Sequence, residues 1–140
     1  MSRAVEIMKS FGEHALIGTV DGLAIMIEDQ LIEVPELMHR SDGQSPYFRI
    51  EIQSDPSGKH ARAYVRHNPF ARPGEGLNAG CSYASCHIAT NGHICIGPHA
   101  STDDAIRNSP YDLEYVIPRA RYLCLAFTAF KLNGSFPQPV

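Results

Sequence analysis

The 140-residue chain has no long hydrophobic run, little excess charge and few cysteines. Its longest apolar stretches, such as Leu23–Ile27, are far too short to span a bilayer, and its amino terminus lacks the hydrophobic region of a signal peptide. The net charge is −3, with Lys and Arg spread along the chain, so there is no basic footprint for a nucleic-acid backbone. We therefore expect a single cytoplasmic domain over residues 1–140 whose partners include neither a membrane nor a nucleic acid.

A domain of this length buries enough apolar surface to fold without a metal ion or a disulfide. Its four cysteines are therefore available for chemistry, and three of them, Cys81, Cys86 and Cys95, fall within fifteen residues of one another. Cys124 lies in an apolar helical pattern, where a cysteine behaves as a small hydrophobic residue. The chemistry is expected within residues 80–99, where histidines are interleaved with the three clustered cysteines.

The hydrophobic pattern predicts a mixed α/β (α+β) fold, in which an antiparallel four-stranded meander is flanked by an amino-terminal helix and carboxy-terminal helices. Apolar residues at helical spacing predict the first helix over Arg3–Phe11, with Ser2 as its cap and Gly12 as its stop. The strands are predicted over Gly22–Glu28, Leu31–Val34, Tyr47–Ile52 and Ala61–Val65, with a turn at Asp55–Gly58.

Prolines and glycines between His67 and Ser85 predict an irregular loop. Further along, Ser109 and Pro110 are typical of a helix start, and a broad apolar stripe follows them. Pro118 interrupts this stripe, so either one helix kinks there or a turn leads into a second helix. Asn133-Gly134 predicts the end of the helical region.

The cysteines and histidines of residues 81–99 are of the types that bind zinc. However, a four-residue gap separates Cys81 from Cys86, and no second tight cysteine pair follows. This spacing differs from the paired ligands of structural zinc sites. A zinc site is therefore the less favoured interpretation of this segment.

A second interpretation makes Cys95 a nucleophile. It follows the turn signal Asn91-Gly92, and its neighbours Ile94 and Ile96 can anchor in the core while the cysteine is presented. Nearby histidines could raise its thiolate fraction, the candidates being His87, His93 and His99. The spacing also permits a simpler role, in which Cys95 is a core thiol buried between two isoleucines.

Residues 88–96, Ile-Ala-Thr-Asn-Gly-His-Ile-Cys-Ile, resemble the active-site segment of ubiquitin-conjugating enzymes. In that family an aliphatic residue is followed four positions later by glycine, then by any residue, an aliphatic residue, the catalytic cysteine and a further aliphatic residue. Upstream, Asn68–Pro73 is similar to the family's Tyr-Pro-Phe-x-Pro-Pro segment, and here Phe70 is expected to pack into the core. The order of the predicted elements also agrees with that fold, although only Pro69–Gly97 is specific.

The departures from the family pattern are informative. Ser85-Cys86-His87 takes the place of a His-Pro-Asn tripeptide, whose asparagine stabilises the oxyanion formed when an amine attacks the thioester. The resemblance implies that His87 donates a hydrogen bond to that charge, as in bacterial members. The chain also lacks the tryptophan of eukaryotic members. The residue that gates the nucleophile has no secure match, and helix capping is an alternative role for each candidate, Ser101, Asp103 and Asp104.

The resemblance implies a bacterial-type conjugating enzyme with Cys95 and His87 as catalytic residues and with neither cofactor nor metal. Cys95 would accept a ubiquitin-like protein from an activating enzyme and pass it to an amine of an acceptor protein, in a pathway of antiphage defence. Arg66, Arg72 and the first helix could contact a partner, although solvated surface is the simpler role for each charge.

Two alternatives remain open. One is a non-catalytic module of the same fold that binds a ubiquitin-like protein, and the other is a small zinc-binding interaction domain. An accessible Cys95 would favour the enzyme, whereas a sulfur buried between its isoleucine neighbours would favour the module.

Overall fold

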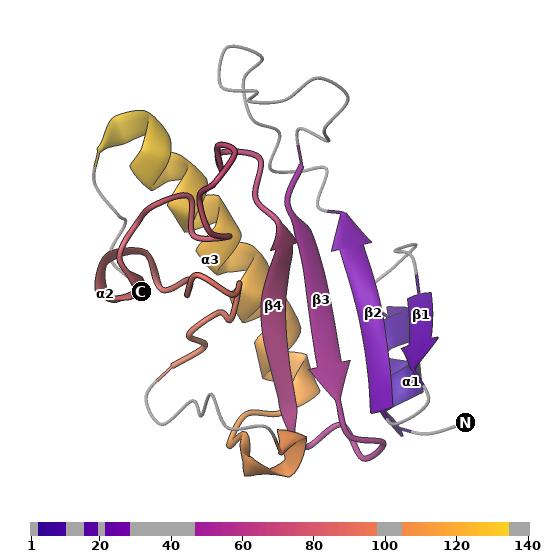
Figure 1. The fold of residues 1–140 in the computed structure, drawn as a ribbon. Coiled ribbons are helices and arrows are strands. Elements are labelled where there is room, and N and C mark those ends of the chain that lie inside the picture. The colour runs from indigo at the N-terminus through magenta and orange to yellow at the C-terminus, as the bar shows by residue number, and fades with distance from the viewer. Residues whose placement is uncertain (1–2, 11–15, 20–21, 29–46, 98–104, 135–140) are drawn as a thin grey trace.

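The computed structural model describes residues 3–10, 16–19, 22–28, 47–97 and 105–134. They form a mixed α/β fold in which an antiparallel sheet packs against a long carboxy-terminal helix (Figure 1). The predicted fold class, the antiparallel pairing and the carboxy-terminal helix are confirmed. The elements are α1 (Arg3–Ser10), β1 (Leu16–Thr19), β2 (Gly22–Glu28), β3 (Arg49–Ser54), β4 (Ala61–His67), α2 (Tyr83–Cys86), the 3₁₀ helix η2 (Ile106–Asn108) and α3 (Leu113–Asn133).

The sheet has the strand order β1-β2-β3-β4. Neighbouring strands are antiparallel, and β3 pairs with β4 from Ser54 opposite Ala61 to Arg49 opposite His67. Because β2 pairs directly with β3, no other strand lies between them. The predicted strand Leu31–Val34 falls outside the described residues, and β1 is not among the strands that the sequence predicts.

The turn between β3 and β4 agrees with the sequence prediction. The Gly58 N–H donates to the Asp55 carbonyl at 3.1 Å, and Gly58 has a φ of 76°, which a glycine adopts without strain. Residues alternate along both strands, so that Ile50, Ile52 and Val65 are buried on the face toward α3.

One hydrophobic core joins α1, β3, β4 and α3 to the segment around Cys95. At its centre, the rings of Phe48, Phe70 and Phe127 contact one another with centroids 5.9–6.3 Å apart. Phe70 is 3% exposed and Cys124 is fully buried, as the sequence predicts for both. From α1, Ala4 and Ile7 reach the same core, while the predicted cap and stop of this helix lie outside the described residues.

The predicted start of the last helix is wrong. α3 begins at Leu113, where the Asp112 side chain accepts a hydrogen bond from the Tyr115 N–H at 2.9 Å. The Ser109 hydroxyl lies before the helix, where it donates to the Ala61 carbonyl of β4 at 2.6 Å and accepts from the Tyr111 N–H at 3.4 Å. Pro110 therefore precedes the helix and does not lie in its first turn.

Pro118 lies inside α3, which continues through it as a single helix. Of the two alternatives that the sequence left open, the second helix is therefore wrong. The helix ends as predicted, since Gly134 takes the left-handed conformation with a φ of 84° and donates to the Phe130 carbonyl at 2.7 Å. In the described part of the chain, no helix has the length and apolar character needed to cross a membrane.

Candidate active site around Cys95

Cys95 lies on a segment that adds to the open edge of β4. The Val65 N–H donates to the Gly92 carbonyl at 2.7 Å, and the Ile94 N–H donates to the Ala63 carbonyl at 3.0 Å. Ile94 and Ile96 are 0% and 2% exposed, as predicted, whereas Cys95 between them is only partly buried. The two isoleucines therefore fix the backbone, whereas Cys95 itself is not fully buried, contrary to the interpretation of Cys95 as a core thiol.

The turn before Cys95 depends on a glycine. The Gly92 N–H donates to the Ala89 carbonyl at 2.9 Å, and Gly92 has a φ of 91°. A Cβ atom at this position would collide with the Val65 carbonyl of β4. The close approach of the turn to β4, which places Cys95, therefore requires a residue without a side chain.

The structure brings His87 beside Cys95 through the backbone. The Cys95 N–H donates to the His87 carbonyl at 2.8 Å, and Ile88 forms an antiparallel bridge with Ile94. His87 is the carboxy-terminal cap of α2, with a left-handed φ of 63°, and its own N–H donates to the Tyr83 carbonyl at 2.9 Å. The two residues predicted as catalytic thus share one short hydrogen-bonded turn, while the action of the His87 imidazole on an oxyanion stays a prediction.

Tyr83 is a candidate site residue that the sequence reasoning did not identify. It begins α2 inside the segment predicted as loop, and its side chain is 38% exposed. Partial burial and the neighbouring Cys95 raise the pKa of the Tyr83 hydroxyl. The only sequence signal was a tyrosine between two of the clustered cysteines, with no spacing rule to connect it to Cys95.

A second phenol lies close to the same segment. A Cβ atom at Gly97 would come within 2.6 Å of the Tyr111 hydroxyl oxygen, so this hydroxyl packs directly over Gly97. Burial and the electrostatic effect of the neighbouring Tyr115 and Cys95 raise the pKa of Tyr111. From α3, the Arg119 side chain donates to the Ile96 carbonyl at 3.3 Å. Polar groups from α3 and from the residues just before it therefore border the Cys95 segment.

Cys81 lies just before α2, and Cys86 is the last residue of this single-turn helix. Cys86 is fully buried, and its sulfur lies 3.2 Å from the Ser82 carbonyl oxygen. Burial and the Cys81 thiol raise the pKa of Cys86 to about 11, so it stays protonated at neutral pH. Cys86 therefore supports the local packing of α2 and is a poor nucleophile.

His93, next to Ile94 in the chain, is buried against Tyr64 of β4, with which it forms a β-bridge. It is 2% exposed, and its ring meets the Tyr64 ring edge-on with centroids 5.3 Å apart. Burial and the Arg62 charge lower the pKa of His93, and no partner for its Nδ1 atom occurs among the described residues. His93 is therefore a neutral packing residue at neutral pH.

Other candidates lie outside the described residues, namely His99, Ser101, Asp103 and Asp104. Within the described ranges, no group of three or more His, Cys, Asp or Glu side chains is arranged to hold a metal ion. All four cysteines are free thiols.

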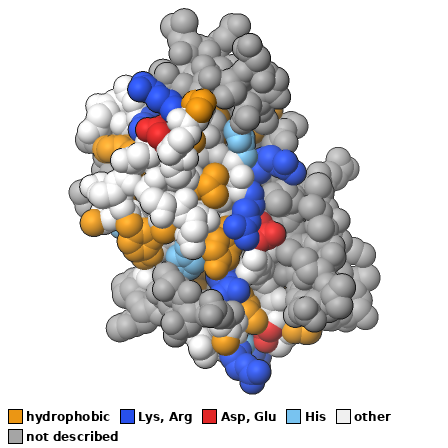
Figure 2. Space-filling view, viewed as in Figure 1, with side chains coloured by type: hydrophobic (Ala, Val, Ile, Leu, Met, Phe, Trp, Pro, Cys, Tyr) orange, Lys and Arg blue, Asp and Glu red, His pale blue; other side chains and the backbone are white. Residues whose placement is uncertain are grey.

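The outer face of β3 and β4 carries charged side chains beside an aromatic ring. Arg66 forms a 2.7 Å ion pair with Glu51, and its guanidinium lies over the Tyr64 ring at 4.5 Å. Figure 2 shows basic and acidic side chains next to each other on this face of the molecule. Arg72 is exposed in the loop after β4. Both arginines are thus exposed to solvent.

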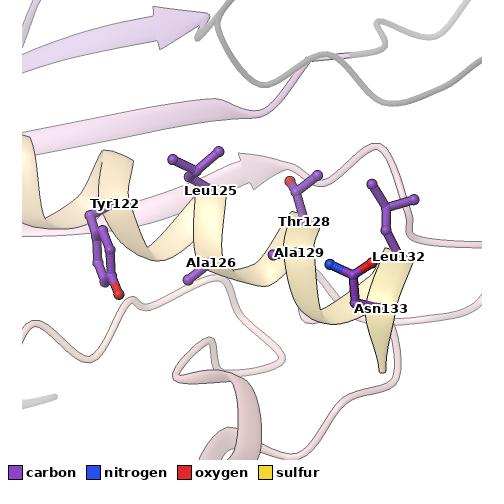
Figure 3. Close-up of a pocket in the computed structure, with 7 residues that line it drawn as sticks. All are labelled: Tyr122, Leu125, Ala126, Thr128, Ala129, Leu132 and Asn133. Carbon is purple, nitrogen blue, oxygen red and sulfur yellow. The ribbon is translucent and has the colours of Figure 1, made fainter. Parts of the chain in front are cut away.

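A separate apolar hollow runs along the carboxy-terminal half of α3 (Figure 3). Its lining includes Leu125 and Leu132, which are about half exposed, together with Tyr122, Ala126, Thr128, Ala129 and Asn133. None of these residues belongs to the Cys95 segment, so the hollow is a distinct surface feature.

No protein-family model matches this chain, and no curated protein or solved structure matches it either.

Proposed function

We propose that this protein is a bacterial-type conjugating enzyme that carries a ubiquitin-like protein as a thioester on Cys95. The observation that supports the proposal is the partly exposed Cys95 thiol on a backbone fixed between two buried isoleucines and hydrogen-bonded to His87. Such a thiol can be reached by a large carboxy-terminal tail and is still held in a defined position. The same exposure favours the enzyme over a non-catalytic module of the same fold.

The reaction consists of two acyl transfers. The Cys95 thiolate attacks the thioester carbonyl that joins the ubiquitin-like protein to its activating enzyme, an Sγ–C bond forms, and the activating enzyme's thiolate leaves. An amine of the acceptor protein then attacks the new thioester and gives up a proton to water, and the Cys95 thiolate leaves. We assign to His87 the donation of a hydrogen bond to the oxyanion of this second step.

As part of the same proposal, the chain has the ubiquitin-conjugating fold. An amino-terminal helix, a four-stranded antiparallel meander and carboxy-terminal helical elements would match the order of the ubiquitin-conjugating fold. The observed sequence of α1, the sheet, the Cys95 segment and α3 supports this assignment. We place the reaction in the cytoplasm, where thiols stay reduced, and in a pathway of antiphage defence.

The test is the formation of an adduct on Cys95. The purified chain is incubated with ATP and with the activating enzyme and ubiquitin-like protein encoded beside its own gene, and gels are run with and without reductant. We expect a reducible adduct for the wild type, none for Cys95→Ala, and a reductant-resistant adduct for Cys95→Ser. Cys81→Ser is the matched control, because Cys81 is also partly exposed. A wild-type chain that never acquires a reducible adduct would overturn the proposal, and retained non-covalent binding would then indicate the module.

A further inference from the structure

We propose that Arg119 makes Cys95 selective for anionic acyl donors, in which a carboxylate lies close to the carbonyl carbon under attack. The proposal names the kind of tail that the nucleophile accepts, and its meaning for conjugation rests on the function proposed above. For a ubiquitin-like protein, it implies an acidic residue next to the carboxy-terminal residue that forms the thioester.

Arg119 and the Cys95 sulfur lie against consecutive carbonyl groups of one backbone stretch. The Arg119 Nε–H donates to the Ile96 carbonyl at 3.3 Å, and the Cys95 sulfur lies 3.8 Å from the Gly97 carbonyl oxygen. Ile96 follows Cys95 directly in the chain. The guanidinium of α3 is therefore anchored on the same short stretch of backbone as the thiol.

Two contacts hold the Arg119 guanidinium in position. Besides the bond to the Ile96 carbonyl, the cation lies over the Tyr122 ring, 5.3 Å from the ring centre. The Arg119 side chain is also partly buried. A cation already held by a carbonyl and an aromatic face loses less side-chain freedom when it binds an anion than a free surface arginine does.

The anchored guanidinium keeps hydrogen-bond donors for another partner. Of its five N–H groups, Ile96 uses the one on Nε, and the four on the terminal nitrogens have no acceptor among the described residues. The ion pairs within the described residues involve Arg3 and Arg66. The planar terminal N–H groups of an arginine match the two oxygens of a carboxylate, so the site has the donors for an anion.

The two segments that meet at Arg119 carry no negative side chain of their own. Residues 81–97 contain neither Asp nor Glu, and α3 has no acidic residue after Glu114. Its charged residues beyond that point, Arg119, Arg121 and Lys131, are all basic. A carboxylate that approaches Cys95 between these segments is thus attracted by a cation and meets no acidic side chain from either of them.

In the proposed reaction the carboxylate is bound and is not changed. The Cys95 thiolate attacks the thioester carbonyl, the Sγ–C bond forms, and the thiolate of the activating enzyme leaves. The neighbouring carboxylate of the tail stays on the Arg119 guanidinium throughout. Arg119 therefore positions the substrate, because it holds the reacting carbonyl beside the sulfur.

The experiment compares two alkylating agents of similar size on the full chain, iodoacetate, which carries a carboxylate, and iodoacetamide, which is neutral. With both reagents the Cys95 thiolate displaces iodide and forms an S–C bond, so the ratio of the two rates cancels changes in the amount and accessibility of the thiolate. Mass spectrometry of the Cys95 peptide gives both rates, in about 10 mM and about 500 mM salt.

For the wild type, we expect the iodoacetate-to-iodoacetamide ratio to fall at high salt, which screens the charge of Arg119. Arg119→Gln should lower the ratio at low salt by about three- to fivefold, as for a partly exposed ion pair, and remove its salt dependence. Arg119→Lys should retain part of the preference, because the charge remains without the planar donors. Arg121→Gln is the matched control, since it removes the same charge about 200° around α3 and should keep the wild-type ratio.

A purely structural role of Arg119 gives a different result. If Arg119 only supported the Ile96 carbonyl, Arg119→Gln would change both rates by the same factor and keep their ratio, and the proposal would be overturned. An equal fall of the ratio in Arg121→Gln would also overturn it, because the preference would then belong to the overall charge of the chain. Since no ubiquitin-like protein is present, failure of the thioester assay leaves this result intact, and an unchanged ratio leaves the conjugation proposal intact.

Discussion

At the scale of single residues, two glycines with the same backbone conformation have different surroundings. Gly92 and Gly74 have φ values of 91° and 87°. A Cβ atom at Gly92 would collide with the Val65 carbonyl, whereas nothing lies within 4 Å of one at Gly74. This pair allows the cost of the left-handed conformation to be separated from the cost of close packing.

We predict that Gly92→Ala lowers the free energy of unfolding by about 3 kcal/mol, because the left-handed conformation costs about 1–2 kcal/mol and overpacking about 1–3 kcal/mol. Gly74→Ala, the matched control, should cost only about 1 kcal/mol. Urea denaturation followed by circular dichroism measures both. Equal losses for the two variants would show that the approach of the turn to β4 contributes nothing.

The buried His93 should make stability depend on pH. Burial and Arg62 lower its pKa from the ordinary 6.5, so the unfolded chain binds this proton at a higher pH than the folded chain. The associated stability is complete above pH 6.5 and is lost as the pH falls toward the lowered pKa, with a slope of at most about 1.4 kcal/mol per pH unit.

The variant His93→Phe keeps the edge-on contact with Tyr64 and removes the titration. We expect its free energy of unfolding to fall less steeply than that of the wild type when the pH is lowered from 6.5 to 5. Parallel urea titrations at each pH provide the comparison. Identical slopes for both proteins would contradict the assignment of a neutral, buried His93.

Sequence reasoning succeeded at residues whose role is local. The Gly92 turn, the buried isoleucines on both sides of Cys95 and the core position of Cys124 all follow from short patterns. Tyr83 was not identified because it is placed beside the Cys95 segment by backbone hydrogen bonds through His87. Those bonds depend on the turn of α2 and the left-handed His87, which no spacing rule in the sequence encodes.

At the scale of elements, the start of α3 depends on the Asp112 side chain. We predict that Asp112→Ala lowers the free energy of unfolding by about 1 kcal/mol, because the Tyr115 N–H loses its acceptor at 2.9 Å. Asp112→Asn retains a capping oxygen and should stay within a few tenths of a kcal/mol of the wild type. Thermal and urea unfolding of the three proteins measure this difference, and an unaffected Asp112→Ala would show that the cap is dispensable.

The sequence predicted the end of this helix better than its start. A left-handed glycine is required to end α3, so Gly134 was a specific signal. At the other end, Ser109-Pro110 was the predicted start, whereas the helix is capped by the Asp112 side chain, which the sequence reasoning did not identify. The Ser109 hydroxyl donates to the Ala61 carbonyl of β4, and this contact forms only in the folded chain.

At the scale of the whole molecule, the thiols report on the shared core. Cys86 and Cys124 are fully buried, whereas Cys81 and Cys95 are partly exposed. We predict that brief alkylation of the native protein modifies only the exposed pair, and that the buried pair becomes reactive with the same urea midpoint as the loss of circular dichroism.

This outcome follows from a single core that joins the Cys95 segment, the sheet and α3. Mass spectrometry of the four cysteine peptides at each urea concentration gives the four labelling curves. Labelling of Cys86 at lower urea than Cys124 would contradict one cooperative unit, because the site region would then unfold before the helix.

The segment that carries Cys95 also determines how the molecule presents its sheet to other copies of itself. Residues 92–94 occupy the hydrogen-bonding edge of β4, with bonds to Val65 and Ala63. An open strand edge is a template for pairing with a neighbouring chain and leads to aggregation. Within the described residues, the segment that carries Cys95 therefore also covers this edge, and substitutions that loosen it should reduce solubility.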